Sequence, residues 1–199
     1  MTWRRYILTG WLGLALSACD AVTESSQAPF PHAIMTPQPA KTLPDLTLTD
    51  GTGSENKLSN LNGKWIWLYF GFTHCPDVCP VAMDAMVGQY KKLKQADQVL
   101  PVFVSVDPKR DANRALKTFT TYYHPAFLGL TGKREAIDEL TRAVGAAYVI
   151  DTPAKPGGDY NVSHSNLVFV LDPQGRHVAT YTPEEKALAD DFNALLTEK

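Results

Sequence analysis

Two cysteines, Cys75 and Cys79, are the residues of this sequence whose type and spacing point most directly to chemistry. They stand four residues apart in the segment GFTHCPDVCP, after an apolar run and before a segment of helical period. Four-residue spacing on a helical turn places the Cα atoms about 6 Å apart, which is within disulfide range and lets both sulfurs reach one metal ion. The pair can therefore be oxidised or metallated, but not both at once.

The prolines that flank the cysteines predict how the two thiols are held. Pro76 disfavours helical geometry at Cys75, whereas Pro80 suits the first turn of the helix that follows. Cys75 is therefore expected in a turn, and Cys79 at or near the helix N-terminus. Free amide donors and the positive end of the helix dipole favour a thiolate there, which is the nucleophilic and metal-binding form of cysteine.

A purely structural role for the pair has little support in the chain. A static disulfide would close a very short loop and would add little stability. Structural zinc takes four protein ligands, and the sequence holds no second cysteine pair. Two soft thiolates with one imidazole suit copper instead, and especially Cu(I).

Five histidines compete to supply that imidazole. His74 adjoins Cys75, but neighbours in an extended segment point in opposite directions, so His74 is expected to support the site without binding metal. His164 enters an apolar strand from a loop rich in Gly and Pro, and the residues alone do not single it out. The other three are expected to be solvated, namely His32 in a proline-rich segment, His124 before Pro125 and His177 on an edge hairpin.

Four segments of the chain together resemble the Sco/SenC family of copper-handling proteins, which has a thioredoxin-like fold. They are GFTHCPDVCP after an aromatic strand, VFVSVDPKRD, FLGLTG, and a histidine before NLVFVLDPQG. The similarity covers about residues 44 to 198. It implies that copper binds to Cys75, Cys79 and His164.

The resemblance also implies a role and partners. Members of the family deliver copper to the binuclear copper centre of cytochrome c oxidase, or reduce the cysteines of that centre. The implied partners are therefore the oxidase subunit that carries the centre and other periplasmic copper carriers. In one respect the chain departs from the family, because Ser163 stands where many members have Asp directly before the histidine. No carboxylate is expected at this position to bind Cu(II) or to orient the imidazole.

The main alternative is a thiol-disulfide oxidoreductase acting through Cys75 and Cys79. In such an enzyme the more exposed cysteine attacks a partner disulfide, and the second cysteine resolves the mixed intermediate. Thioredoxin-type reductases resemble CxxC proteins with a cis-proline facing the disulfide. This chain has CxxxC, and a histidine rather than a proline precedes strand 166–171, which favours metal binding. Peroxide reduction by one low-pKa cysteine is a weaker alternative, since the motif segment has no arginine.

The elements that must position these residues alternate between apolar runs of strand length and segments of helical period. This alternation predicts an α/β fold with a largely parallel sheet covered on both faces. The turn Asp172-Pro173-Gln174-Gly175 predicts a hairpin between the last two strands, which makes the sheet mixed. Together with the resemblance, the expected architecture is thioredoxin-like, with a mixed central sheet flanked by helices on both faces.

The expected strands and helices follow from the same patterns. A final helix is predicted to begin at Thr182 as N-cap, with Pro183 in the first turn and Glu185 closing a capping box. Met83 and Met86 are expected in the core, as are the aromatic residues of segment 65–70. Strands are predicted at 46–49, 65–70, 100–106, 127–130, 148–150, 166–171 and 176–180, and the other helices at 81–95, 111–122 and 133–144.

The first 18 residues are expected to be a lipoprotein signal peptide. A positively charged start and the apolar run 6–16 lead into LSAC, which resembles the bacterial lipobox. Cys19 would then carry the lipid, and Asp20 resembles the inner-membrane retention signal. The expected location is the cytoplasmic membrane, with the protein exported and facing the periplasm.

Composition sets the remaining limits. The chain has 199 residues, 44% hydrophobic and 20% charged, which suits one globular domain. Several prolines with Ser, Thr and Gln predict a lipid-anchored tether over 19–43, followed by a copper-binding domain over 44–199. A net charge of −2 leaves no basic excess for nucleic acid, so no such partner is expected.

Overall fold

The computed structural model describes residues 29–111, 114–153, 155 and 158–197. The expected signal peptide and Cys19 lie outside the described residues. Among the helices that are described, none has the length and apolar character that a bilayer crossing needs.

An eight-stranded sheet forms the centre, in the order β1-β10-β9-β4-β5-β6-β2-β3. Strand β4 (Trp65–Gly71) pairs in parallel with β5 (Val99–Ser105), which pairs in parallel with β6 (Leu128–Thr131). On its other side β4 pairs antiparallel with β9 (Val168–Leu171), and β9 forms a hairpin with β10 (Arg176–Tyr181). The outer strands are β1 (Lys41–Thr42), β2 (Thr47–Asp50) and β3 (Glu55–Lys57).

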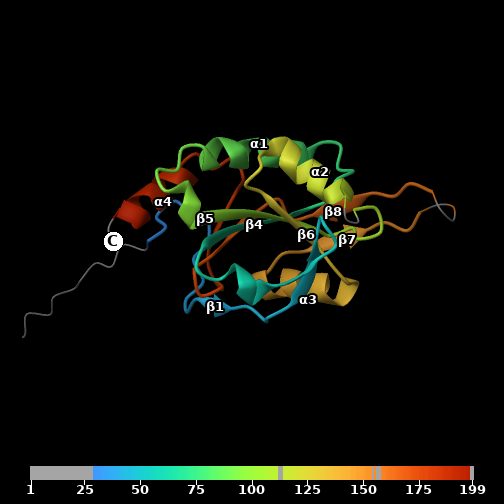
Figure 1. Ribbon diagram of the computed structural model, residues 1–199, viewed down its shortest axis with the longest axis horizontal. Coiled ribbons are helices and arrows are strands. Elements are labelled where there is room, and N and C mark those ends of the chain that lie inside the picture. Colours follow the sequence, from blue (N-terminus) through green and yellow to red (C-terminus); the bar gives the residue numbers. More distant parts are fainter. Residues whose placement is uncertain (1–28, 112–113, 154, 156–157, 198–199) are drawn as a thin grey trace, which may run out of the picture.

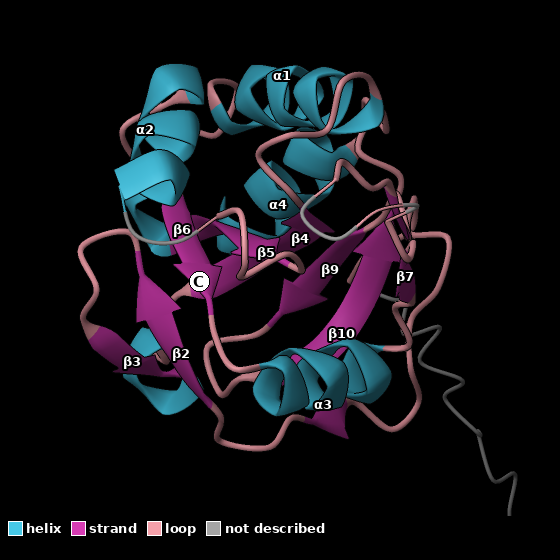
Figure 2. Cartoon of the chain, turned by 90° about the vertical axis from the view of Figure 1, so that its right-hand side faces the viewer, coloured by secondary structure: helices cyan, strands magenta, loops and turns pink. Residues whose placement is uncertain are grey.

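Helices cover both faces of this sheet. Helices α1 (Val78–Tyr90), α2 (Arg114–Tyr123) and α4 (Leu188–Thr197) lie over one face (Figure 1). Helix α3 (Arg134–Val144) lies over the other, as Figure 2 shows from a second side. The expected α/β fold, with a mixed central sheet between helices, is confirmed.

A second, two-stranded sheet stands apart from the main one. It consists of β7 (Tyr148–Ile150) and β8 (Val162–His164), which pair antiparallel. Two short 3₁₀ turns, Leu58–Leu61 and Ala96–Gln98, complete the regular structure of the described residues.

The apolar strands predicted that most strand pairs in the sheet would be parallel, and this prediction is wrong. Two of the seven pairings in the main sheet are parallel and five are antiparallel. Strand β9 is buried along its whole length although both of its pairings are antiparallel. A continuous apolar run therefore reports burial on both faces and does not report strand direction.

The predicted start of the last helix is also wrong. Helix α4 begins at Leu188, six residues after Thr182. The intervening residues form turns, in which the Glu185 amide donates to the Thr182 carbonyl at 3.1 Å. The Glu185 carboxylate accepts from the Ala187 amide at 3.0 Å, so it bonds forward along the chain instead of back to a cap at Thr182.

The sequence pattern placed His177 on an exposed edge hairpin, but this side chain is buried. The reason is that β1 pairs with the outer side of β10, so β10 is not an edge strand. The imidazole Nε2 lies 2.8 Å from the Thr180 hydroxyl and 3.1 Å from the Ala179 carbonyl. His124 is half-buried, and its Nδ1 accepts from the Ala126 amide at 3.2 Å.

Residues 29–43, which composition assigned to a tether, pack on the domain. Phe30 is 2% exposed, and its ring meets Trp65 edge-on with centroids 5.7 Å apart. The exposed His32 binds the buried Asp191 through an Nδ1 to Oδ1 contact of 2.6 Å. A large aromatic residue thus fixes this proline-rich segment, and the folded part extends N-terminal of residue 44 to at least Pro29.

Removing the Phe30 ring should destabilise the domain. Phe30→Ala is expected to lower the free energy of unfolding by about 3 kcal/mol, because it empties an aromatic pocket. Urea denaturation followed by tryptophan fluorescence measures this, since Trp65 lines the pocket. The control Ile34→Ala, at a position that is 57% exposed, should change stability by less than about 0.5 kcal/mol. Equal stability of the Phe30→Ala protein and wild type would contradict the packing described here.

Candidate metal centre

The two cysteines lie where a buried strand passes into a helix. Strand β4 ends at Gly71, and α1 begins at Val78. Cys75 lies in the intervening turn, half-buried, and its amide donates to the Phe72 carbonyl at 3.2 Å. Cys79 is the second residue of α1 and is fully buried. This is the placement that Pro76 and Pro80 predicted.

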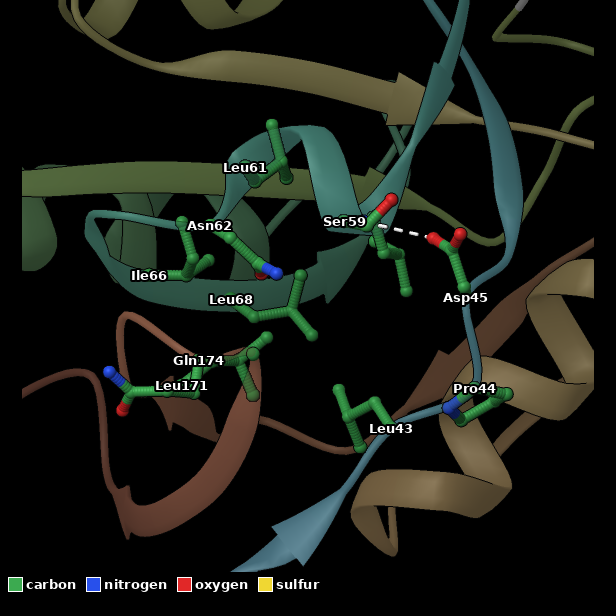
Figure 3. Close-up of a pocket in the computed structure, with 12 residues that line it drawn as sticks. Leu43, Pro44, Asp45, Ser59, Leu61, Asn62, Ile66, Leu68, Leu171 and Gln174 are labelled. Atoms are coloured by element: carbon green, nitrogen blue, oxygen red, sulfur yellow. Dashed lines mark hydrogen bonds between the residues drawn. The ribbon is translucent and has the colours of Figure 1, made fainter.

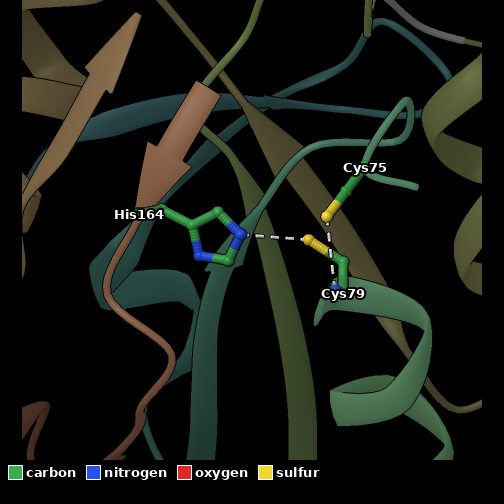
Figure 4. A group of neighbouring side chains, drawn as sticks. All are labelled: Cys75, Cys79 and His164. Atoms are coloured by element: carbon green, nitrogen blue, oxygen red, sulfur yellow. Dashed lines mark hydrogen bonds between the residues drawn. The ribbon is translucent and has the colours of Figure 1, made fainter. Parts of the chain in front are cut away.

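His164 reaches the thiols from the end of β8. Its Nε2 lies 3.2 Å from the Cys79 sulfur, although the two residues are 85 positions apart (Figure 4). Ligand atoms of Cys75, Cys79 and His164 all lie within 4.8 Å of one another. The imidazole lies beyond the loop rich in Gly and Pro, on the paired strand β8, where Tyr148 of β7 is opposite His164.

The imidazole is held as a ligand rather than as a cation. Its Nδ1 lies 3.1 Å from the Ser165 carbonyl, so Nδ1 carries the proton and Nε2 presents its lone pair to the sulfurs. Burial lowers the pKa of His164 below its ordinary value of 6.5, which favours the neutral ring. In its thiol form, Cys79 therefore donates to Nε2.

Two aromatic rings fix the orientation of the imidazole. Tyr69 and Phe72 meet the His164 ring edge-on, with centroids 5.9 and 6.1 Å away. The Tyr69 hydroxyl donates to the Asn166 side-chain carbonyl at 2.9 Å, which ties β4 to the chain just after His164. The strand pattern assigned Tyr69 to packing alone, and no local signal in the sequence indicates its place beside the ligand.

The two sulfurs have different electrostatic surroundings. The Cys75 sulfur accepts a hydrogen bond of 3.3 Å from the Cys79 amide, one of the free donors at the helix start. Burial raises the pKa of the Cys79 thiol and Cys75 raises it further, although hydrogen bonding to Phe72 and Tyr69 acts in the opposite direction. The expectation that the helix N-terminus favours a thiolate at Cys79 is therefore wrong, because desolvation outweighs the helix dipole there.

Gly71 is required by the closeness of the Cys79 sulfur. A Cβ atom at this position would lie 2.8 Å from that sulfur and 2.8 Å from Cε2 of Phe103. Both distances are shorter than real Cβ contacts, so the site would have to shift. Gly71 is the last residue of β4, and no local pattern in the sequence indicates its close approach to Cys79.

Other residues of the motif support the loop without joining the cluster. The side chain of His74 is 53% exposed, and its Nδ1 lies 3.3 Å from the buried Asp111. Asp111 also accepts from the Thr73 amide at 2.7 Å and from its hydroxyl at 2.6 Å. Met83 and Met86 are fully buried in the core, as expected. Among the described residues, Cys75, Cys79 and His164 form the one group of His, Cys, Asp and Glu dense enough to hold a metal ion.

The types of ligand atom in the cluster determine which metal ion the site suits. Two thiols and a neutral imidazole are soft to intermediate ligands, and no carboxylate joins them. Ser163 is exposed, and neighbours in a strand point to opposite faces, so its side chain lies on the other side of β8 from the imidazole. The arrangement therefore suits a thiophilic ion bound by three protein ligands.

A separate pocket of about 200 Å³ lies between β4, the β9–β10 turn and the chain before β2 (Figure 3). Leu43, Leu58, Ile66 and Leu68 give it an apolar lining, and the Ser59 amide donates to Asp45 at 3.0 Å beside it. None of the three clustered residues lines this pocket, so it is not an entrance to the thiols.

Comparison with known proteins finds similar sequences. A family model described as SCO1/SenC matches residues 35–196. The mitochondrial protein SCO2 of Saccharomyces cerevisiae is 36% identical over 133 residues, which cover 66% of this chain and 44% of that protein. A putative copper-binding protein of Stutzerimonas stutzeri is 36% identical over 137 residues, covering 68% of this chain and 66% of that protein. The matched part thus spans less than two thirds of these relatives.

Solved structures agree with the sequence matches. The crystal structure of yeast Sco1 has a TM-score of 0.72 at 31% identity, covering 79% of this chain and 99% of that one. Arabidopsis thaliana ScoI with copper bound has a TM-score of 0.69 at 32% identity, covering 77% and 97%. With a family match over most of its length and this likeness in structure, the chain belongs to the SCO1/SenC family.

Proposed function

We propose that this protein binds one copper ion through Cys75, Cys79 and His164 and transfers it to a recipient protein. The observation that carries the proposal is the 3.2 Å approach of the His164 Nε2 to the Cys79 sulfur, with the Cys75 sulfur beside them. Soft thiolates and an imidazole are ligands that copper prefers. The printed names of the Stutzerimonas stutzeri relative and the Arabidopsis thaliana structure also refer to copper.

The asymmetry of the two cysteines suits transfer. Cys75 is the more exposed sulfur, so a thiolate of the recipient can approach the metal from its side. A three-ligand site leaves room for that incoming ligand. Once copper leaves, burial favours the protonated form of Cys79, because its pKa is raised. Protonation of this thiol opposes return of the metal.

The proposed recipient is the subunit of cytochrome c oxidase that carries the binuclear copper centre. Other periplasmic copper carriers are further partners, and a lipid on Cys19 holds the protein on the cytoplasmic membrane. These assignments rest on the family and on the LSAC segment. Assembly of the oxidase in a deletion strain, with and without added copper, tests them. Normal assembly of the oxidase in the deletion strain without added copper would contradict the assignment of this recipient.

A thiol-disulfide oxidoreductase is the second proposal, and one observation favours it. The amide of Cys79 donates to the Cys75 sulfur, and Cys75 is the more exposed of the two cysteines, so its thiolate is the one that a partner disulfide can reach. That thiolate would attack a partner disulfide, and the Cys79 sulfur would then displace the partner thiol and close the Cys75–Cys79 disulfide. A protein that gains no thiolate-to-copper absorption with copper, yet reduces disulfides, would favour this role over metal transfer.

Loss of the imidazole should weaken copper binding without unfolding the protein. His164→Ala is expected to lower Cu(II) affinity at least about tenfold, because one of three ligands is removed. Titration of the reduced full-length protein, followed by thiolate-to-copper charge-transfer absorption, measures the affinity and a stoichiometry of one. His124→Ala removes an imidazole elsewhere and should leave the affinity unchanged. Equal affinity of wild type and His164→Ala would remove His164 from the site.

The contribution of His164 should persist under mildly acidic conditions. Its pKa lies below 6.5, so the neutral ring is retained as pH falls through 6.5, and proton competition for Nε2 begins only at lower pH. Thiol protons compete equally in wild type and in His164→Ala. The ratio of the two Cu(II) affinities is therefore expected to stay constant between about pH 7.5 and 6.5. A ratio that falls about twofold or more over this interval would contradict a lowered pKa, because a ring with a pKa of 6.5 is already half protonated at the lower limit.

Filling the space at Gly71 should disturb the centre. Gly71→Ala is expected to displace the Cys79 sulfur, to lower copper affinity about tenfold and to reduce stability by about 1 to 3 kcal/mol through overpacking. Gly88→Ala in α1 is the matched control, because nothing lies within 4 Å of a Cβ there. The control should bind copper as wild type does and gain up to about 1 kcal/mol in stability. Unchanged copper affinity in Gly71→Ala would argue against the tight packing of this sulfur.

A further inference from the structure

The hairpin that carries His164 is not part of the main sheet. Among the residues that the structure describes, strands β7 and β8 pair only with each other, and an isolated pair of strands is marginally stable in water. The imidazole nevertheless lies 3.2 Å from the Cys79 sulfur, a distance that tolerates little movement of the hairpin. Other contacts must therefore fix it.

Tyr160, two residues before β8, makes several contacts with one segment after β5. Its hydroxyl donates to the Asp107 carboxylate at 2.7 Å. Its carbonyl accepts from Nη1 of Arg110 at 3.1 Å, and the guanidinium carbon lies 3.8 Å from the centroid of its ring. Asp107 thus binds the hydroxyl of Tyr160, and Arg110, three positions later, binds its carbonyl and its ring.

Asp107 and Arg110 are themselves held firmly. They form an ion pair through Nε of Arg110, and the Asp107 side chain is fully buried. The Asp107 amide donates to the hydroxyl of Ser105, the last residue of β5, at 3.1 Å. The guanidinium also lies 5.5 Å from the ring centroid of Phe72, which packs against His164. The pair therefore contacts both the chain leading to His164 and the loop leading to Cys75.

The other strand of the hairpin has its own attachment. Tyr148, opposite His164 in β7, bonds through its hydroxyl to Arg134 at 2.6 Å and to Asp138, both in α3. This contact fixes β7 on the α3 side of the sheet. On the β8 side, Tyr160 holds the chain before His164, and the bond between Tyr69 and Asn166 holds the chain after it.

We propose that Asp107, Arg110 and Tyr160 are positioning residues that hold His164 over the thiol pair. The inference rests on the proposed copper site and concerns residues that do not touch the metal. We call these three residues the clamp. Without the clamp, the β7–β8 hairpin samples positions in which Nε2 of His164 is out of reach of copper. The apparent affinity for copper is then the intrinsic affinity multiplied by the fraction of time that the hairpin spends in the binding position.

The test compares two variants that each lose one tyrosine hydroxyl. Tyr160→Phe keeps the ring on the guanidinium and loses the bond to Asp107. Tyr90→Phe loses a comparable bond of 3.1 Å to the Ala96 carbonyl, at the far end of α1 from Cys79. In the full-length protein, Tyr160→Phe is expected to bind Cu(II) about tenfold more weakly. Its electron paramagnetic resonance spectrum should show weaker nitrogen coupling, whereas Tyr90→Phe should match wild type.

A double-mutant cycle shows whether Tyr160 acts through the imidazole. Tyr160→Phe introduced into His164→Ala should cause no further loss of Cu(II) affinity, since there is no ligand left to position. Arg110→Lys keeps the charge but loses the planar fork that binds Asp107 and Tyr160 together, so it should weaken nitrogen coupling as Tyr160→Phe does.

The outcomes separate this inference from the proposed function. Wild-type affinity and nitrogen coupling in both Tyr160→Phe and Arg110→Lys would overturn the clamp and leave the copper site intact. An equal loss caused by Tyr160→Phe with and without His164 would also overturn it, because the effect would then be one on general stability. A wild-type protein that binds no copper would overturn the copper site and the clamp with it.

Discussion

The contact between the His164 imidazole and the Cys79 sulfur is the constraint around which the rest of the domain is arranged. Cys79 is fully buried and His164 is half-buried, and burial penalises any polar group that lacks a partner. The structure meets this requirement through a chain of bonds from the Cys79 thiol to Nε2 and from Nδ1 to the Ser165 carbonyl. Tyr69 and Phe72 then fix the plane of the ring. The Cys79 sulfur and the imidazole are thus held close together, in positions from which both can bind a cation.

Two opposing effects act at the start of α1. Free amides at a helix N-terminus stabilise negative charge, and here the Cys79 amide is directed at the Cys75 sulfur. Burial acts in the opposite sense on Cys79, one turn further into the protein. Cys75 and Cys79, four residues apart in one motif, therefore differ in exposure and in the groups that surround their sulfurs. In the proposed transfer, this difference gives the Cys75 sulfur the contact with a partner and makes the Cys79 sulfur an internal ligand.

Local patterns in the sequence were sufficient for elements whose geometry is set by neighbouring residues. The prolines of the motif correctly placed Cys75 in a turn and Cys79 in a helix, and the Asp172–Gly175 turn gave the hairpin. Local patterns failed where contacts with a distant segment determine the structure. Strand β1 pairs with β10 at His177, and Phe30 packs into an aromatic pocket beside Trp65. His164 is such a case too, since 85 residues separate it from Cys79. Only the family resemblance indicated it.

If Cys19 carries a lipid, as proposed, the position of Phe30 bears on which end of the domain is nearer the membrane. Its ring lies against Trp65, the first residue of β4, whereas the Cys79 sulfur lies against Gly71, the last. Seven residues of extended strand separate these two ends by about 20 Å. With the proposed lipid on Cys19, the chain would enter the domain at the pole nearest the bilayer. The copper ligands would then occupy the opposite pole, where a recipient can dock from the aqueous phase without displacing lipid headgroups.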